Sequence, residues 1–203
     1  MAAQIAIGTG DGCQLAGVVA SGLAQVRTDY GWPMSGLTVR PVVPAEYDAL
    51  GDLVVAAYLS VPGDDHVSPS YEGTLRDVDA RARDAVVLVA VDEADRLLGG
   101  VTYVPGAGPF AELERDGDAG IRMLAVSPAA HRRGVGRRLV EECIDRARAD
   151  GRRRIVLHTA ASMTAAQALY VRLGFARAPH LDGLVPAANL MAYTLDLDTG
   201  EPS

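Results

Sequence analysis

The sequence lacks several features that would place it in common functional classes. It contains no lysine, so all 19 of its basic residues are arginine, and a Walker-type nucleotide loop, which needs Gly-Lys-Ser/Thr, is excluded. No apolar run reaches the length that spans a bilayer, so no membrane partner is expected. Two cysteines, Cys13 and Cys143, lie far apart and in no metal-type spacing. This scarcity predicts a reduced intracellular compartment, the cytoplasm.

Histidine and positive charge are also scarce, and this excludes further partners. Of the 4 histidines, His158 and His180 have no partners at metal-ligand spacing, so no metal site is expected. The 26 acidic residues outweigh the basic ones and give a formal net charge of −7 at pH 7. No nucleic-acid partner is expected, because such binding depends on neutralising phosphates. What the chain does have is apolar content, 49% of its 203 residues, enough to bury one good core in a single domain.

The most informative stretch spans residues 124–139 and reads LAVSPAAHRRGVGRRL. An apolar strand ends at a Ser-Pro break, a basic loop closes on Gly134 and Gly136, and an arginine-rich helix follows. Glycine lets a backbone approach a ligand closely, and the first amides of a helix lack internal partners and lie at the positive end of its dipole. The stretch therefore predicts a site for a phosphate-bearing ligand. The alternative is that the arginines only solvate a helix start, but neither glycine favours a helix there.

A dinucleotide fingerprint does not fit this loop. It needs a third glycine where Leu139 stands, and an acidic residue at the end of the next strand, where residues 157–159 read LHT. Two motifs do fit together: HRRGVG at residues 131–136, and AQALY at residues 166–170 followed by LGF at residues 173–175. In this order, separated by a helix and a strand, they resemble the coenzyme A site of the GCN5-related N-acetyltransferase (GNAT) family.

The resemblance covers residues 37–197 and implies a single α/β domain. Its central mixed, twisted sheet would have helices on both faces and a parallel pair of strands splayed around the acetyl-coenzyme A site. The chain's own pattern agrees, because a strand, a helix and a strand through the phosphate loop make a parallel pair with a right-handed crossover.

Residues 1–36 are expected to form a loose glycine-rich arm, with Met34 a candidate start, and residues 198–203 a tail. Hydrophobic periodicity predicts strands at residues 37–40, 85–91, 97–104, 121–126, 155–159 and 190–197, and helices at residues 44–59, 71–83, 136–149 and 164–173.

The resemblance implies acetyl-coenzyme A as the co-substrate. In this family the pantetheine arm bonds to the backbone of the first splayed strand, and the pyrophosphate rests on the amides of the loop. His131 stands where the family usually has arginine or glutamine, and Met163 where it often has an asparagine. The contact of that asparagine is expected either to be lost or to move to Thr159 or Ser162. Carried over position by position, the cofactor-binding residues are Leu124, Ala125, Val126, His131, Arg132, Arg133, Gly134, Val135, Gly136, Arg137, Thr159 and Ala166.

Tyr170 is the candidate catalytic residue. It matches the tyrosine of the family's Leu-Tyr pair, which is commonly assigned the protonation of the departing thiolate. The alternative is a packing role, with the hydroxyl bonded to backbone, and the two roles can coexist.

The removal of the amine proton has no single candidate residue. The family often has a carboxylate just before its central strand, but here that position is Gly120. Glu112, Glu114 and Asp118 lie nearby and read as solvated loop carboxylates or bases, and a water chain is a further route. The loop at residues 62–69 borders the acceptor site in this family, so the candidate substrate residues are Tyr58, His66, Glu112 and Asp118.

Together these observations predict an N-acetyltransferase that moves the acetyl group of acetyl-coenzyme A to a primary amine by direct attack in a ternary complex. Acidic loops indicate a cationic acceptor, such as a polyamine, an aminoglycoside or a protein N-terminus, so a small molecule or a peptide fits equally. Two alternatives stay open: a non-catalytic acyl-coenzyme A sensor on the same fold, and a transferase for a longer acyl chain. The oligomeric state is open as well, a dimer included.

Overall fold

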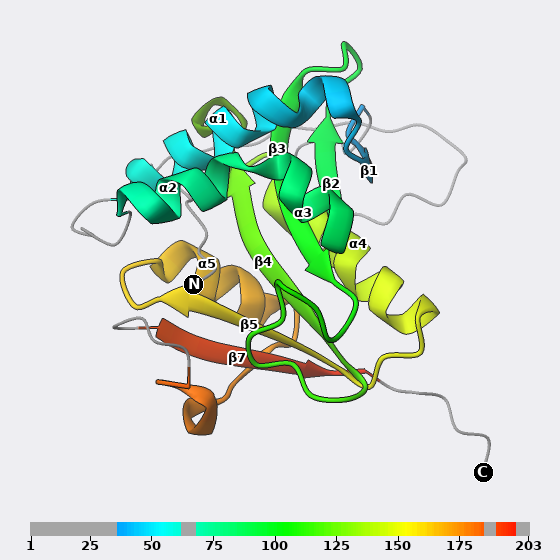
Figure 1. Ribbon diagram of the computed structural model, residues 1–203, viewed down its shortest axis with the longest axis vertical. Coiled ribbons are helices and arrows are strands. Elements are labelled where there is room, and N and C mark those ends of the chain that lie inside the picture. The colour runs from blue at the N-terminus through cyan, green and yellow to red at the C-terminus, as the bar shows by residue number, and fades with distance from the viewer. Residues whose placement is uncertain (1–35, 62–67, 185–189, 198–203) are drawn as a thin grey trace, which may run out of the picture.

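A mixed, seven-stranded sheet forms the centre of the described parts of the chain in the computed structural model (Figure 1). The structure describes residues 36–61, 68–184 and 190–197. In the order of the sheet, the strands are β1 (Thr38–Pro41), β2 (Val86–Val91), β3 (Leu97–Val104), β4 (Asp118–Val126), β5 (Arg154–Ala160), β7 (Leu190–Asp196) and β6 (Ala176–Arg177). Neighbouring strands are antiparallel except β4 and β5, which are parallel.

Helices cover both faces of this sheet (Figure 1): α1 (Tyr47–Leu59), α2 (Pro69–Arg76) and α3 (Val78–Asp84) on one, α4 (Val135–Ala149) and α5 (Thr164–Arg172) on the other. The side chains of β2 show how the sheet packs against both helix layers, because successive residues of a strand point to opposite faces. Val87, Val89 and Val91 pack with α1 to α3, whereas Leu88 and Ala90 pack with α4 and α5. The predicted mixed sheet with helices on both faces is confirmed. Short 3-10 helices lie at Pro44–Glu46, Pro128–Ala130 and Pro179–Leu181.

The predicted single helix at residues 71–83 is wrong, because the chain forms two helices that meet at Asp77. Asp77 has φ −76° and ψ 77°, outside the helical region, and its carboxylate accepts a hydrogen bond from the amide of Ala80 at 2.9 Å. It therefore caps the start of α3 in a conformation that cannot continue α2. Two smaller differences concern strands: β4 begins at Asp118, before the predicted residue 121, and β6 was not predicted.

The parallel pair joined by α4 is confirmed, and its pairing stops early. β4 and β5 are paired from Asp118 with Arg154 to Ile121 with Leu157. Both strands continue beyond that point, β4 to Val126 and β5 to Ala160, but β4 pairs there with β3 and β5 with β7. The two strands are therefore hydrogen-bonded to each other at one end, the joined end, and unpaired with each other at the other, the open end.

Some predictions fall on residues that the structure does not describe. These are the arm, except its last residue, the tail at residues 198–203, and His66 in the loop after α1. Within the described ranges, no helix is long and apolar enough to cross a membrane.

Candidate active site

The loop before α4 presents a row of backbone donors. Gly134, the residue before the helix, has φ 77°, and Arg132 has φ 62°, so the chain turns twice through left-handed conformations. As a result, no residue in the described ranges accepts a hydrogen bond from the amide of Arg132 or from the amides of residues 134–137. Unsatisfied amides at the start of a 15-residue helix are the donors that a bound anion needs, and the helix dipole adds partial positive charge there.

The arginines around this loop differ in how much free charge they supply. Arg137 and Arg138 each pair with a glutamate one turn along α4, at 2.7 and 3.4 Å. Arg132 and Arg133 are exposed, and neither has a carboxylate partner among the described residues. The uncompensated positive charge therefore lies in the loop itself, beside the free amides.

His131 turns inward at the same place. Its Nε2 lies 3.1 Å from the carbonyl oxygen of Val126, at the end of β4. The start of α4 is also close, because a Cβ on Gly136 would lie 3.4 Å from Val126 Cγ2 and 3.5 Å from Leu169 Cδ2. The loop at residues 131–134 therefore lies next to the open end of β4 and next to α5.

Beyond the last β4–β5 pair, several residues of the predicted cofactor set are buried. Leu124, Ala125 and Val126 are all buried on β4, and Ala166 is buried in the first turn of α5. Thr159 on β5 is fully buried, and its Oγ1 has no hydrogen-bond partner among the residues described. A buried hydroxyl without a partner costs about 1–3 kcal/mol, so this atom fits a polar ligand in the gap.

Tyr170 lies at the end of α5 and is locked by aromatic packing. Its ring lies 5.5 Å from that of Phe175 and 6.0 Å from that of Tyr193. The residue is only 2% exposed, yet no described residue forms a hydrogen bond with its hydroxyl. Burial raises the pKa of Tyr170, so the phenol is protonated at neutral pH.

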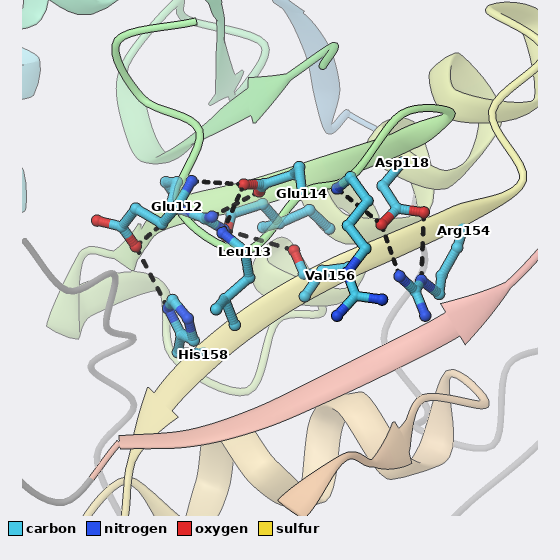
Figure 2. Close-up of polar contacts among 10 residues, drawn as sticks. Glu112, Leu113, Glu114, Asp118, Arg154, Val156 and His158 are labelled. Carbon is cyan, nitrogen blue, oxygen red and sulfur yellow. Dashed lines mark hydrogen bonds and ion pairs between the residues drawn. The ribbon is translucent and has the colours of Figure 1, made fainter. Parts of the chain in front are cut away.

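A second polar cluster lies beside the last β4–β5 pair, where the loop after β3 folds onto the strands (Figure 2). Arg122 on β4 is 3% exposed and pairs with two loop carboxylates, Glu114 at 2.5 Å and Glu112 at 3.3 Å. Glu112 also approaches His158 on β5, with 3.4 Å between Oε2 and Nδ1. Sequence reasoning did not assign Arg122 or His158 to the site. Arg122 did carry a signal, as the one charged residue in the apolar strand predicted at residues 121–126.

The remaining candidates lie on two sides of this cluster. Tyr58 is buried in α1, with its ring 6.2 Å from that of Tyr71 on α2. Burial, together with the charge of Glu112, raises the pKa of Tyr71. Asp118 lies at the joined end of the strand pair, where it accepts a hydrogen bond from Arg154 at 2.7 Å (Figure 2). Asp118 therefore stabilises the end of the strand pair at which β4 and β5 are hydrogen-bonded.

Comparison with known proteins agrees with this geometry. The model of the acetyltransferase (GNAT) family matches residues 49–175. The N-alpha-acetyltransferase RimI of Mycobacterium tuberculosis is 35% identical over 83 residues, which are 41% of this chain and 51% of that protein. The matched stretch thus spans about half the length of this relative.

Solved structures share the fold. A ribosomal-protein-alanine N-acetyltransferase from Brucella melitensis is 24% identical, with a TM-score of 0.58 over 79% of this chain and 99% of its own. A protein from Salmonella typhimurium, solved with its cofactor acetyl-CoA, is 23% identical, with a TM-score of 0.58 over 81% of this chain and 95% of its own. At these identities the likeness is one of fold.

Proposed function

The chain belongs to the acetyltransferase (GNAT) family, and from this premise we propose that it transfers the acetyl group of acetyl-coenzyme A to a primary amine. The observation that carries the proposal is the row of free amides before α4, next to the open end of the β4–β5 pair. Phosphates on the amides and an acyl chain in the gap match the two ends of one elongated molecule.

Acetyl-coenzyme A accounts for each unsatisfied group in this region. Its pyrophosphate would accept hydrogen bonds from the amides of Arg132 and of residues 134–137, with the side chains of Arg132 and Arg133 neutralising its charge. Its pantetheine amides would bond to the backbone of residues 124–126, which has no β5 partner, and to the Thr159 hydroxyl. The Salmonella relative holds the same compound.

The reaction joins two substrates in one complex. The neutral amine attacks the carbonyl carbon of the thioester, a C–N bond forms, and the C–S bond breaks to release a thiolate. The amine nitrogen loses one proton to water as the amide forms. Tyr170 then donates its phenolic proton to the sulfur. Packing against Phe175 and Tyr193 fixes the ring, and the hydroxyl competes with no bond to another described residue.

The acceptor would enter beside Tyr58 and Glu112. Because the Mycobacterium tuberculosis relative is named an N-alpha-acetyltransferase, a peptide with a free α-amine is the first acceptor to assay, followed by polyamines and aminoglycosides. Thiol release from acetyl-coenzyme A and the mass of the product report transfer. Binding of coenzyme A without transfer to any amine would favour a sensor on the same fold, and faster transfer from longer acyl donors would favour a different acyl specificity.

A further inference from the structure

A buried arginine joins β4 to β5 at the point where their pairing ends. Arg122 is only 3% exposed, and it follows Ile121, whose pair with Leu157 is the last between the two strands. Its Nη1 donates hydrogen bonds to the carbonyl oxygen of Ile121 on β4 at 2.9 Å and to that of Val156 on β5 at 3.4 Å (Figure 2). One guanidinium nitrogen therefore bonds both strands where they begin to separate, a point that we call the fork.

A buried carboxylate holds this arginine in place. Arg122 Nη2 donates a hydrogen bond to Glu114 Oε1 at 2.5 Å, and the Glu114 side chain is fully buried. The other oxygen of the same carboxylate accepts hydrogen bonds from the amides of Glu112 and Leu113 at 2.6 and 3.0 Å. A Cβ on Gly120 would overlap the carboxylate, so the glycine leaves the space that the ion pair occupies beside the fork.

This ion pair makes the fork resistant to further opening. Two charges buried together stabilise each other, and separating them leaves each one uncompensated in surroundings of low dielectric constant. Opening the strands by one more residue pair would break the Ile121–Leu157 pair and draw the Val156 carbonyl away from Arg122. The fork is therefore held at one position along β4 and β5.

In the proposed binding mode, the acyl group of the donor lies nearest to the fork. The pyrophosphate lies at the loop that follows β4, and the pantetheine lies beside residues 124–126 of that strand. The rest of the molecule then runs back along β4 toward Arg122, so the acyl group comes last. The methylenes of a longer acyl group would have to part the paired strands or separate the guanidinium from its partners, and both cost free energy.

We propose that Arg122 and Glu114 restrict the donor to acetyl-coenzyme A, because they fix the fork against which the acyl group lies. This inference rests on the proposed acetyl transfer and adds the acyl specificity of the same site. Neither residue makes or breaks a bond in the reaction, so both are specificity-determining residues. The wild type should use acetyl-coenzyme A at least about tenfold better, in kcat/KM, than propionyl-coenzyme A, since one methylene is typically worth about tenfold to two-hundredfold.

The test is the double variant Arg122→Met/Glu114→Gln, assayed with both donors and the best amine. It removes both charges and keeps similar side-chain volumes, so no uncompensated charge is left buried. We expect the ratio of kcat/KM for propionyl- to that for acetyl-coenzyme A to rise by about tenfold, because the fork can then yield to one methylene.

The matched control is Arg40→Met/Glu46→Gln. The same residue types form a bidentate pair there, at 2.9 and 2.7 Å, but Arg40 lies on β1, and β2 and β3 separate that strand from β4. The ratio of this variant should stay within about twofold of the wild-type ratio. A ratio of donors separates specificity from a structural role, because a loss of folded enzyme lowers turnover with both donors alike.

Each outcome decides. If the wild type transfers propionyl as well as acetyl, or if the double variant keeps the wild-type ratio, this inference alone is overturned. If the wild type transfers acetyl to no amine, the proposed function fails and this inference fails with it. Should the double variant lose its response to coenzyme A, and so its fold, Arg122→Lys is assayed: lysine keeps the charge but has one nitrogen where arginine uses two. A raised ratio then supports the inference, and an unchanged ratio overturns it.

Discussion

At the residue scale, a single hydroxyl carries the proposed leaving-group chemistry. The Tyr170 ring is held by Phe175 and Tyr193, and burial raises the pKa of its phenol. Packing explains the ring but not the hydroxyl, which forms no bond with any described residue. The two roles that the sequence left open can therefore be separated by removing the oxygen alone.

Tyr170→Phe should lower kcat with the best acceptor by at least about tenfold, because general acid catalysis is typically worth about a hundredfold to ten-thousandfold and water can substitute in part. Binding of acetyl-coenzyme A should change little, since the packing ring is kept. Steady-state kinetics and a binding titration measure both quantities. Turnover within about twofold of wild type, under half a kilocalorie per mole of barrier, would leave Tyr170 only its packing role.

The backbone of the loop before α4 depends on Gly134, which has a left-handed conformation. Gly134→Val should abolish the rise in melting temperature that coenzyme A produces, because valine resists a φ of 77° and the amides of the loop would turn away. Gly151→Val is a matched control: Gly151 follows the other end of α4 at φ 63°, and a Cβ there would meet no described neighbour within 4 Å. Gly151→Val should lower the free energy of unfolding by about as much as Gly134→Val does, and it should keep the rise in melting temperature that coenzyme A produces. An equal response in both variants would contradict the assignment of the loop.

At the scale of elements, β4 connects its unpaired end, where we propose that the cofactor binds, to the polar cluster around Arg122. The sequence was enough to predict β4, α4 and β5 in order, because glycine spacing and a strand-helix-strand pattern are local signals. The cluster of Arg122, Glu112 and His158 was not predictable, because it joins three segments whose contact depends on how a long loop folds. The break at Asp77 was local but was missed, since the capping signal competed with a continuous helical pattern.

A bidentate ion pair holds the last elements together. Arg177 on β6 donates to Asp182 at 3.0 and 2.5 Å, and the amide of Ala192 on β7 donates to the same carboxylate at 2.9 Å. These bonds, led by that of Arg177, lower the pKa of Asp182. A carboxylate with a lowered pKa contributes stability that is present above its ordinary pKa and is lost as the pH falls through its folded pKa.

Asp182→Asn should therefore lower the free energy of unfolding at pH 7 by about 1 kcal/mol, a value reduced for partial exposure of the pair. As the pH falls below about 4, the ordinary pKa of aspartate, the difference between wild type and variant should begin to shrink, and it should vanish below the lowered pKa of Asp182. Denaturant unfolding at pH 7, 5 and 3 measures the difference. Asp79→Asn is the control, because its pair with Arg83 is mostly exposed. A difference that does not change with pH would contradict the ion-pair explanation.

At the scale of the whole molecule, fold and binding site share one framework. One apolar cluster joins α4, α5 and the sheet, and it includes residues on both sides of the cofactor gap, such as Val126, Ala160 and Ala166. A ligand in that gap therefore contacts elements that must already be packed. Unfolding would have to release it, so binding and global stability should be linked.

A chain that begins at Met34 should show this linkage as fully as the complete chain, because all the site residues that the structure describes lie between Tyr58 and Tyr170 and the sheet between Thr38 and Asp196. Coenzyme A at a hundred times its Kd should stabilise either chain by about 2.7 kcal/mol, a rise in melting temperature of roughly 5–10 °C for a domain of this size. Thermal unfolding with and without ligand measures both. A response in the complete chain alone would mean that residues 1–33 belong to the binding domain, contrary to the expected boundary. No response in either chain at millimolar ligand would instead contradict the coenzyme A site itself.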